Sequence, residues 1–329
     1  MKVGLDVYSI REMELTPMQQ LDYAKSRGFE GVQFEELRSL SPSLDRRELA
    51  ALQARAAELA LYTHVSVSAV NPNLFTLSRE ALLARLGEEI EAASALGWRE
   101  VRSHMGILKN RLESQKPWAE HLEDSISVLR ELRPLLRQSG VRLNLESHSD
   151  STTFELLRVI RRIGPDYVGI TLDTGNLLTH GEYPVEAVRR LAPYAHLTHA
   201  KDAYLFFSPK GFIRQGCPPG RGVVEWEKVV SILAEYNPEI NLSIEDHKKL
   251  FEINFGDPAW LAWHPDIPTY ELGQLMRLAF AIEEKRRAGL VADMLEYEAV
   301  PYLEQVEDRL PSGCQYLKAL LDTMGLHGH

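Results

Sequence analysis

Apolar and polar positions along the chain repeat a simple order: a short apolar or alternating run, a loop, and a longer segment with helical period. The short runs are typical of buried strands, and the longer segments are typical of amphipathic helices. Glycines follow several helical segments, where a helix C-cap is expected. We expect strands at residues 2–9, 31–36, 61–68, 100–106, 141–148, 167–173, 196–202 and 240–246.

Repetition of this strand–helix unit favours a (β/α)₈ TIM barrel. The predicted strands end near residue 246, so each unit has roughly 31 residues, as in barrels of this class. An open doubly wound sheet would need a glycine-rich phosphate turn after its first strand. The segment 5–15, LDVYSIREMEL, has no such turn. The predicted fold class is therefore α/β, with a TIM barrel.

After Lys248 the pattern changes. Insertion 204–222, rich in Gly and Pro, and segment 250–271 are both expected to be loops. Helices are expected at 270–288, 290–310 and 315–324, and a barrel needs only the first of them as its eighth helix. We expect a barrel domain at 1–288 and a C-terminal helical extension at 289–329, packed on the barrel or on a partner.

Composition narrows the class of protein. The 329 residues are 44% hydrophobic and carry a formal net charge of −10, with no basic stripe of the kind that binds nucleic acid. No apolar run is long enough to cross a bilayer, and the first residues lead directly into strand-like sequence. Cys217 and Cys314 lack the spacing of a zinc or redox motif. We expect a cytoplasmic protein with no nucleic-acid or membrane partner.

Polar side chains stand at the ends of the last four predicted strands: Glu146 in NLESH, Asp173 in TLDTGN, His199 in THAKD and Glu245 in SIEDH. Barrel strands all end on one face, so these side chains should converge. Converging carboxylates raise one another's pKa unless a cation compensates their negative charge. Taken singly, each residue could be a helix cap or part of an ion pair. Together they predict a divalent metal site.

The motifs LESH, LDTGN, HLTHAKD and LSIED resemble those of the xylose isomerase-like TIM barrels. This family includes sugar isomerases and epimerases, inosose-type dehydratases and type-IV apurinic endonucleases. The resemblance, over residues 1–247, implies one divalent ion, with Mn²⁺ as our first expectation and Mg²⁺, Co²⁺ or Zn²⁺ as alternatives. It implies proton abstraction next to a carbonyl group, with Glu146 and Glu245 passing the proton. The implied metal ligands are Glu146, Asp173, His199 and Glu245.

An endonuclease of this family would need further histidines for two more metals. His64 and His104 stand at suitable strand ends. Asn176, however, occupies the place of one required histidine, and no Asp-x-His follows THAKD. The incomplete set and the acidic charge argue against DNA repair.

His148 departs from the epimerase pattern. It resembles a histidine in the metal-bearing α subunit of the C-glycoside deglycosidases, which looks like the base acting on a 3-oxo-sugar. The tail 257–279 is also similar to that group. Alternatively, His148 is structural and hydrogen-bonds Asp150 or Asp246.

Other polar residues could contact substrate, but each has a structural alternative. Lys201 and Asp202 could form a rim salt bridge, Arg221 could be solvated, and Asn176 could cap a helix or bond a ligand carboxylate. The candidates are His104, Asn176, Lys201, Asp202, Arg221, Glu35 and Glu36. Residues that could wall a sugar or aglycone pocket, or anchor the tail, are Trp260, Trp263 and His264.

The first expected function is a divalent-metal-dependent sugar isomerase or epimerase that forms an enediolate. The alternative is a C-glycoside deglycosidase α subunit, a lyase on a 3-oxo-glycoside that works with a small β subunit. An inosose-type dehydratase and a non-catalytic carbohydrate-binding subunit are further possibilities. The expected partners are a small-molecule sugar or glycoside, with a homo-oligomer or a small partner subunit.

Overall fold

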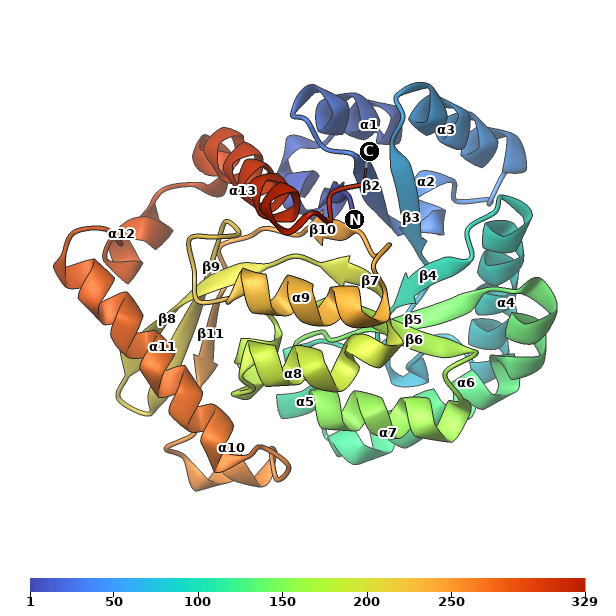
Figure 1. Cartoon of the computed structure of the whole chain (residues 1–329). Coiled ribbons are helices and arrows are strands. Elements are labelled where there is room, and N and C mark those ends of the chain that lie inside the picture. The colour runs from blue at the N-terminus through green and yellow to red at the C-terminus, as the bar shows by residue number, and fades with distance from the viewer. Residues whose placement is uncertain (329) are drawn as a thin grey trace.

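The computed structural model describes residues 1–328 and has a parallel sheet at its centre, in the order β10-β1-β2-β3-β4-β5-β6-β7 (Figure 1). Strands β10 and β7 also meet, because the Ala200 N–H donates to the Ser243 carbonyl at 2.7 Å. The sheet thus forms a nearly closed barrel, and the predicted fold and strand positions are confirmed. The strands are β1 Val3–Asp6, β2 Gly31–Glu36, β3 Tyr62–Ser66, β4 Glu100–Ser103, β5 Arg142–Glu146, β6 Val168–Asp173, β7 Ala195–His199 and β10 Leu242–Ile244.

Helices cover the outside of the barrel, and local polar signals start many of them. Thr16, Asp45, Ser78 and Thr152 each accept a backbone N–H in the first turn of the helix that follows. The α-helices are α1 Pro17–Ser26, α2 Leu37–Leu40, α3 Arg46–Glu58, α4 Arg79–Ala95, α5 Leu108–Leu112, α6 Trp118–Ser139, α7 Thr153–Ile163, α8 Pro184–Leu191 and α9 Trp226–Tyr236. Short 3₁₀ helices are η1 Val7–Met13, η2 Pro72–Leu74, η3 Leu177–His180 and η4 Ala192–Tyr194.

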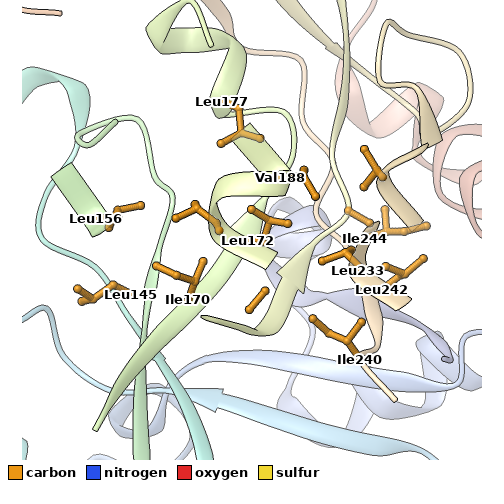
Figure 2. Packing of buried hydrophobic residues seen from close by; sticks show 14 of the residues in the cluster. Leu145, Leu156, Ile170, Leu172, Leu177, Val188, Leu233, Ile240, Leu242 and Ile244 are labelled. Atoms are coloured by element: carbon orange, nitrogen blue, oxygen red, sulfur yellow. The ribbon is translucent and has the colours of Figure 1, made fainter. Parts of the chain in front are cut away.

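Side chains on each strand alternate between the helices and the barrel interior. Leu145 on β5 and Ile170 on β6 belong to the apolar layer that also holds Leu156 of α7 and Val188 of α8 (Figure 2). On each strand, the residues that alternate with these apolar side chains face the barrel interior. Glu146, which follows Leu145, is one of them. Apolar packing therefore fixes which polar side chains enter the barrel.

Tyr62 fills the barrel interior near the start of the strands. Its hydroxyl lies 3.1 Å from Ser243 Oγ. A Cβ atom on Gly4 would lie 2.1 Å from that hydroxyl oxygen, and one on Gly31 would lie 2.2 Å from the ring. The two glycines therefore leave the space that the Tyr62 ring occupies.

A second, antiparallel sheet stands beside the barrel in the order β11-β9-β8 (Figure 1). The loops predicted at 204–222 and 250–271 are therefore wrong. Apolar residues stand on both sides of Pro209 and Lys210, which form a hairpin turn, and residues 250–253 pair with the hairpin from far along the chain. The elements are β8 Asp202–Ser208, β9 Gly211–Cys217, β11 Leu250–Ile253 and helix α10 Pro258–Ala262.

The C-terminal helices are α11 Thr269–Arg287, α12 Met294–Ala299 and α13 Tyr302–Met324. The break predicted between residues 310 and 315 is wrong. Pro311 lies inside α13, where the buried neighbours Leu310 and Cys314 hold the helix through the proline.

Helix α11 contacts β8, whereas α13 contacts β1 and β10. The helix that covers the barrel after its last strand is therefore α13. The prediction that helix 270–288 is the eighth helix of the barrel is wrong. A domain boundary near residue 288 stays a prediction. No helix of residues 1–328 is long and apolar enough to span a membrane.

We expect Gly31→Ala to destabilise the protein by about 1–3 kcal/mol, because the new methyl group overlaps the Tyr62 ring. Gly273→Ala in α11 is the matched control, since nothing lies within 4 Å of its added Cβ. Denaturant unfolding of both variants measures the difference. Equal stability of the two variants would contradict this account of the barrel interior.

Candidate metal centre and substrate cavity

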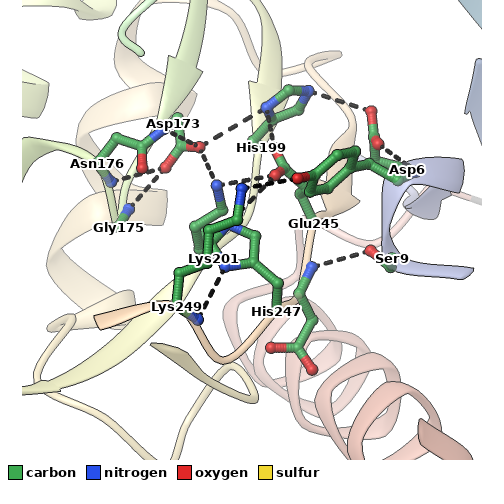
Figure 3. A network of polar contacts seen from close by, with 12 residues as sticks. Asp6, Ser9, Asp173, Gly175, Asn176, His199, Lys201, Glu245, His247 and Lys249 are labelled. Carbon is green, nitrogen blue, oxygen red and sulfur yellow. Dashed lines mark hydrogen bonds and ion pairs between the residues drawn. The ribbon is translucent and has the colours of Figure 1, made fainter. Parts of the chain in front are cut away.

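Four polar side chains from neighbouring strands meet at the carboxyl end of the barrel. Glu146, Asp173, His199 and Glu245 are buried, and each offers one ligand atom, all within 4.8 Å of one another. His199 Nδ1 lies 2.7 Å from Glu245 Oε2 and 3.7 Å from Asp173 Oδ2 (Figure 3). The same nitrogen lies 3.2 Å from Glu146 Oε1. The structure thus brings together the four residues that the sequence predicts to converge, and this group could bind a divalent metal ion.

Backbone and side-chain donors orient the Asp173 carboxylate. Its Oδ1 accepts the Gly175 N–H at 3.0 Å and the Asn176 N–H at 2.8 Å. The Asn176 side-chain amide donates to Oδ2 at 2.8 Å. Of the two structural alternatives considered for Asn176, the structure shows the contact with a ligand carboxylate.

The other ring nitrogen of His199 faces Asp6, whose Oδ2 lies 3.2 Å from Nε2. Asp6 Oδ2 is buried and has no hydrogen-bond partner among the described residues, so its negative charge favours a proton on Nε2 and a free lone pair on Nδ1. The Gln33 amide is 2.6 Å from the same Nε2, and a half-turn of the amide presents its oxygen to that proton. Asp6 and Gln33 thus turn Nδ1 towards the carboxylates, as a metal ligand requires.

Charges around the four residues shift their protonation. Burial alone lowers the pKa of His199, but Glu146 and Glu245 raise it well above its ordinary value. Burial raises the pKa of both glutamates, yet His199 with His148 holds that of Glu146 well below its usual range, and Lys201 with His199 does so for Glu245. The carboxylates therefore demand positive charge at this point, and a divalent ion fits the donor set.

Two further cations bind the same carboxylates. Arg102 Nη1 lies 2.9 Å from Glu146 Oε2, and Lys201 Nζ lies 2.9 Å from Glu245 Oε1. In both glutamates this is the oxygen that does not face His199 Nδ1. Lys201 Nζ also lies 2.7 Å from Asp173 Oδ2, the oxygen that does face His199. These ion pairs hold the carboxylates in place.

A cavity of about 790 Å³ opens beside the four residues. His104, Asn176 and Lys201, which are candidates for substrate contacts, line it, and so do Glu35, Glu36 and the candidate base His148. Other lining residues are Tyr8, Arg102, Glu146, Glu245, His247, Lys249 and Phe251.

His148 does not bond Asp150 or Asp246 in the described contacts. Its Nδ1 lies 2.8 Å from the Gly106 carbonyl, and Asp246 pairs with Arg309 at 2.6 Å. Because a carbonyl only accepts, the neutral His148 ring carries its proton on Nδ1 and its lone pair on Nε2.

Two predicted substrate residues lie outside the cavity wall. Asp202 is buried as an anchor for the chain, and it accepts from the Trp226 indole at 3.0 Å and from backbone N–H groups. Arg221 turns away to Asp308 and Ser312 of α13, at 2.9 and 3.0 Å. The path of the loop, which the sequence did not reveal, points both side chains away from the centre.

The tail aromatics line a smaller neighbouring cavity of about 350 Å³. Trp260 is buried and stacks on His264, which lies 3.0 Å from His180. These two residues serve as anchors for the tail, while Trp263 is partly exposed.

The sequence analysis missed several residues around the centre: Asp6, Gln33, Arg102, His247 and Lys249. The alternation of side chains along each strand could have identified them, because residues two apart face the same side. Arg102 precedes His104 by two residues, and Gln33 precedes Glu35 by two. His247 likewise follows Glu245.

We expect Glu146→Gln and Glu245→Gln each to reduce Mn²⁺ affinity at least about 10-fold, because each change removes a charged ligand. Equilibrium dialysis followed by metal analysis measures this. Glu113→Gln, an exposed surface change, is the control. Parental metal affinity in both ligand variants would refute the assignment.

Asp6→Asn should weaken Mn²⁺ binding by about 10-fold, because the partner that orients His199 loses its charge. Asp6 also caps η1, so Asp45→Asn, which alters the cap of α3, is the matched control. A competition titration with a metal-binding dye measures both affinities. An equal effect in the two variants would mean that Asp6 acts only as a helix cap.

Comparison with known proteins gives two curated relatives. YihM of Escherichia coli (strain K12), an uncharacterized protein, is 24% identical over 232 residues, which is 68% of this chain and 64% of YihM. The 3-oxo-isoapionate decarboxylase of Pectobacterium atrosepticum is 28% identical over 126 residues, 37% of this chain and 46% of that protein. The chain therefore matches less than two thirds of either relative.

Solved structures share the fold at low sequence identity. A D-psicose 3-epimerase crystallised with D-fructose has a TM-score of 0.61 and 15% identity, over 87% of this chain and 98% of its own. A magnesium complex of a xylose isomerase-like TIM barrel protein from Mycobacterium smegmatis has a TM-score of 0.58 and 17% sequence identity. The match covers 84% of this chain and 97% of that protein. The 3-keto-D-glucoside 4-epimerase YcjR from E. coli has a TM-score of 0.55 and 17% sequence identity. The match covers 84% of this chain and 99% of YcjR.

A family profile described as the xylose isomerase-like TIM barrel matches residues 21–261, well over half of the chain. This range includes the strands that carry all four residues of the candidate metal centre. The chain belongs to the xylose isomerase-like TIM barrel family.

Proposed function

We propose that this protein is a divalent-metal-dependent enzyme that removes a proton next to a carbonyl group of a sugar, as an isomerase or epimerase. The observation that carries the proposal is a single cavity lined by His148 and by two of the four candidate ligands, Glu146 and Glu245. The names of two similar structures, both epimerases, and of the decarboxylase relative support chemistry beside an oxo group.

In this proposal Glu146, Asp173, His199 and Glu245 hold the ion, with Mn²⁺ as the first expectation and Mg²⁺, Co²⁺ or Zn²⁺ as alternatives. The ion supplies Lewis-acid stabilisation of the negative charge that develops on the substrate oxygen.

His148 is the proposed base. Its Nε2 carries the lone pair because Nδ1–H donates to Gly106, and the side chain lines the cavity. The substrate C–H bond breaks, the proton goes to Nε2, the electron pair forms a C=C bond, and the carbonyl π pair moves onto the carbonyl oxygen to give an enediolate. Return of the proton to the neighbouring carbon, with transfer of the hydroxyl proton between the two oxygens, gives an isomer. An epimer requires protonation of the opposite face by a second group, because His148 lies on one face only.

The family resemblance offers another route, in which Glu146 and Glu245 pass the proton. Both carboxylates are held in ion pairs with Arg102 or Lys201, and their pKa values are well below the usual range. A carboxylate stabilised in this way is a weak base, so the contacts favour His148.

A lyase on a 3-oxo-glycoside, the C-glycoside deglycosidase type, is the second candidate. The smaller cavity shares Leu108 and Phe251 with the main one, so it could receive an aglycone. Such an α subunit would require a small partner chain, which co-purification from the native source would reveal.

Solvent exchange tests the proposal. We expect Mn²⁺-loaded protein in D₂O to introduce deuterium beside the carbonyl group of a ketohexose, an inosose or a 3-oxo-glucoside, as measured by NMR. Release of an aglycone would favour the lyase. Metal binding without exchange into any of these compounds, or exchange that persists after chelation, would refute the proposed reaction.

His148→Asn should retain Mn²⁺ but lower the exchange rate by about 10²–10⁴-fold, the usual contribution of a general base. Metal content is the internal control, because His148 is not among the four candidate ligands. An unchanged rate would assign proton transfer to the glutamates.

A further inference from the structure

One wall of the main cavity presents hydrogen-bond donors and positive charge. Tyr8, which follows β1, and His247 and Lys249, which follow β10, line this wall. Lys249 Nζ donates to the Tyr8 hydroxyl at 2.8 Å and lies 5.2 Å from the centre of the Tyr8 ring. Figure 3 shows Lys249 and His247 on the same side of Glu245 as Lys201.

Lys249 differs from the other cations that line this cavity. Arg102 and Lys201 bind carboxylates of the metal centre, and Lys109 lies 3.8 Å from Glu113. Arg38 and Arg85 bind glutamates as well. Among residues 1–328, no carboxylate lies within ion-pair distance of Lys249.

The remaining groups of this wall can also donate. Tyr8 accepts from Lys249, so its own hydroxyl proton is available to an acceptor. His247 Nδ1 accepts the Lys249 backbone N–H at 3.4 Å, which places the ring proton on Nε2, 3.6 Å from Glu245 Oε1. An ammonium, a hydroxyl and an imidazole N–H therefore border the same space.

A buried guanidinium behind the wall adds to its positive potential. Arg214 of β9 is fully buried, and within the described chain none of its three nitrogens has a hydrogen-bond partner. It lies 5.3 Å from the centre of the Phe251 ring, and a Cβ added to Gly175 would lie 3.0 Å from Arg214 Nη2 and 2.7 Å from Lys201 Cγ. A buried cation without hydrogen bonds is costly. The Asp173 and Glu245 carboxylates offset part of that cost, and a substrate anion would offset more of it.

The cavity is also lined by a carboxylate. Glu35 lies on β2, the neighbour of β1, and no hydrogen-bond or ion-pair partner of its carboxylate is found among the described residues. Glu35 therefore suits sugar hydroxyl groups and repels an anion, whereas the Lys249 wall attracts one.

We propose that Lys249, Tyr8 and His247 bind a carboxylate of the substrate, so that the enzyme acts on oxo-sugar acids. This inference rests on the proposed function and names its substrate class. One carboxylate oxygen accepts from Lys249 and the other from Tyr8 or His247, while the hydroxyl groups lie towards Glu35. The carboxylate and not a phosphate group is favoured, because the wall provides one ammonium group and no cluster of backbone N–H donors.

Binding calorimetry with Mn²⁺-loaded protein tests the proposal. D-Gluconate and D-glucitol share a carbon chain and differ in the carboxylate, and D-glucitol 6-phosphate carries a different anion. We expect gluconate to bind at least about 10-fold more tightly than glucitol. Lys249→Gln should remove this difference and leave glucitol binding unchanged. Lys109→Gln, which removes an equal charge from the same cavity, should preserve it.

Parental gluconate affinity in Lys249→Gln would overturn the assignment, since the carboxylate would then bind elsewhere, including at the metal. A Lys249-dependent affinity for the phosphate ester alone would also overturn it. The proposed reaction can fail separately. Deuterium exchange into a neutral sugar without a preference for gluconate refutes only the carboxylate site, and the reverse result refutes only the proposed reaction.

Discussion

Compensation of negative charge inside the barrel is the constraint on which the rest of the centre depends. Glu146, Asp173 and Glu245 come from separate strands and converge on His199. Their mutual repulsion would push one of them towards protonation in the absence of cations. Arg102 and Lys201 bind the outer oxygens of Glu146 and Glu245, which leaves the inner oxygens of the two glutamates for a divalent ion. Lys201 also binds Asp173 Oδ2, which faces the centre.

Residues two apart on a barrel strand face the same side but lie at different heights along the barrel axis. The layer that contains Arg102, Glu146 and Glu245 defines the charge of the centre. Two residues further along the same segments are side chains of the cavity wall, such as His148 and His247. Contacts with substrate can therefore change in the second layer while the ligand set in the first layer stays the same.

The sequence predicted the barrel strands because a parallel strand needs a continuous buried run, and each run was visible locally. It predicted the convergence of Glu146 and Glu245 because strand ends share one face. It missed the second sheet, whose strand β11 pairs with β9 from more than thirty residues away. It also misplaced the eighth helix, since only tertiary packing of α13 on β1 and β10 decides that position.

The direction in which a side chain points was harder to predict from the sequence than its position along the chain. Asp202 and Arg221 stand near the metal centre in the sequence, but hydrogen bonds within the loop and to α13 turn them away. Arg102 shows the converse, because a residue of a type usually found at the surface lies inside the barrel, next to Glu146. Residue type alone does not determine which way a side chain points.

Asp202 has a consequence for how the β8–β9 hairpin can vary. Its Oδ1 accepts from the backbone of Ala203 and Val224, and its Oδ2 accepts from Gly220, Gly222 and the Trp226 indole. One carboxylate thus ties the point where the chain leaves the barrel to the point where it returns. A change in the excursion between them can therefore leave the register of the strand that carries His199 unchanged, provided that β9 keeps its pairing with β11.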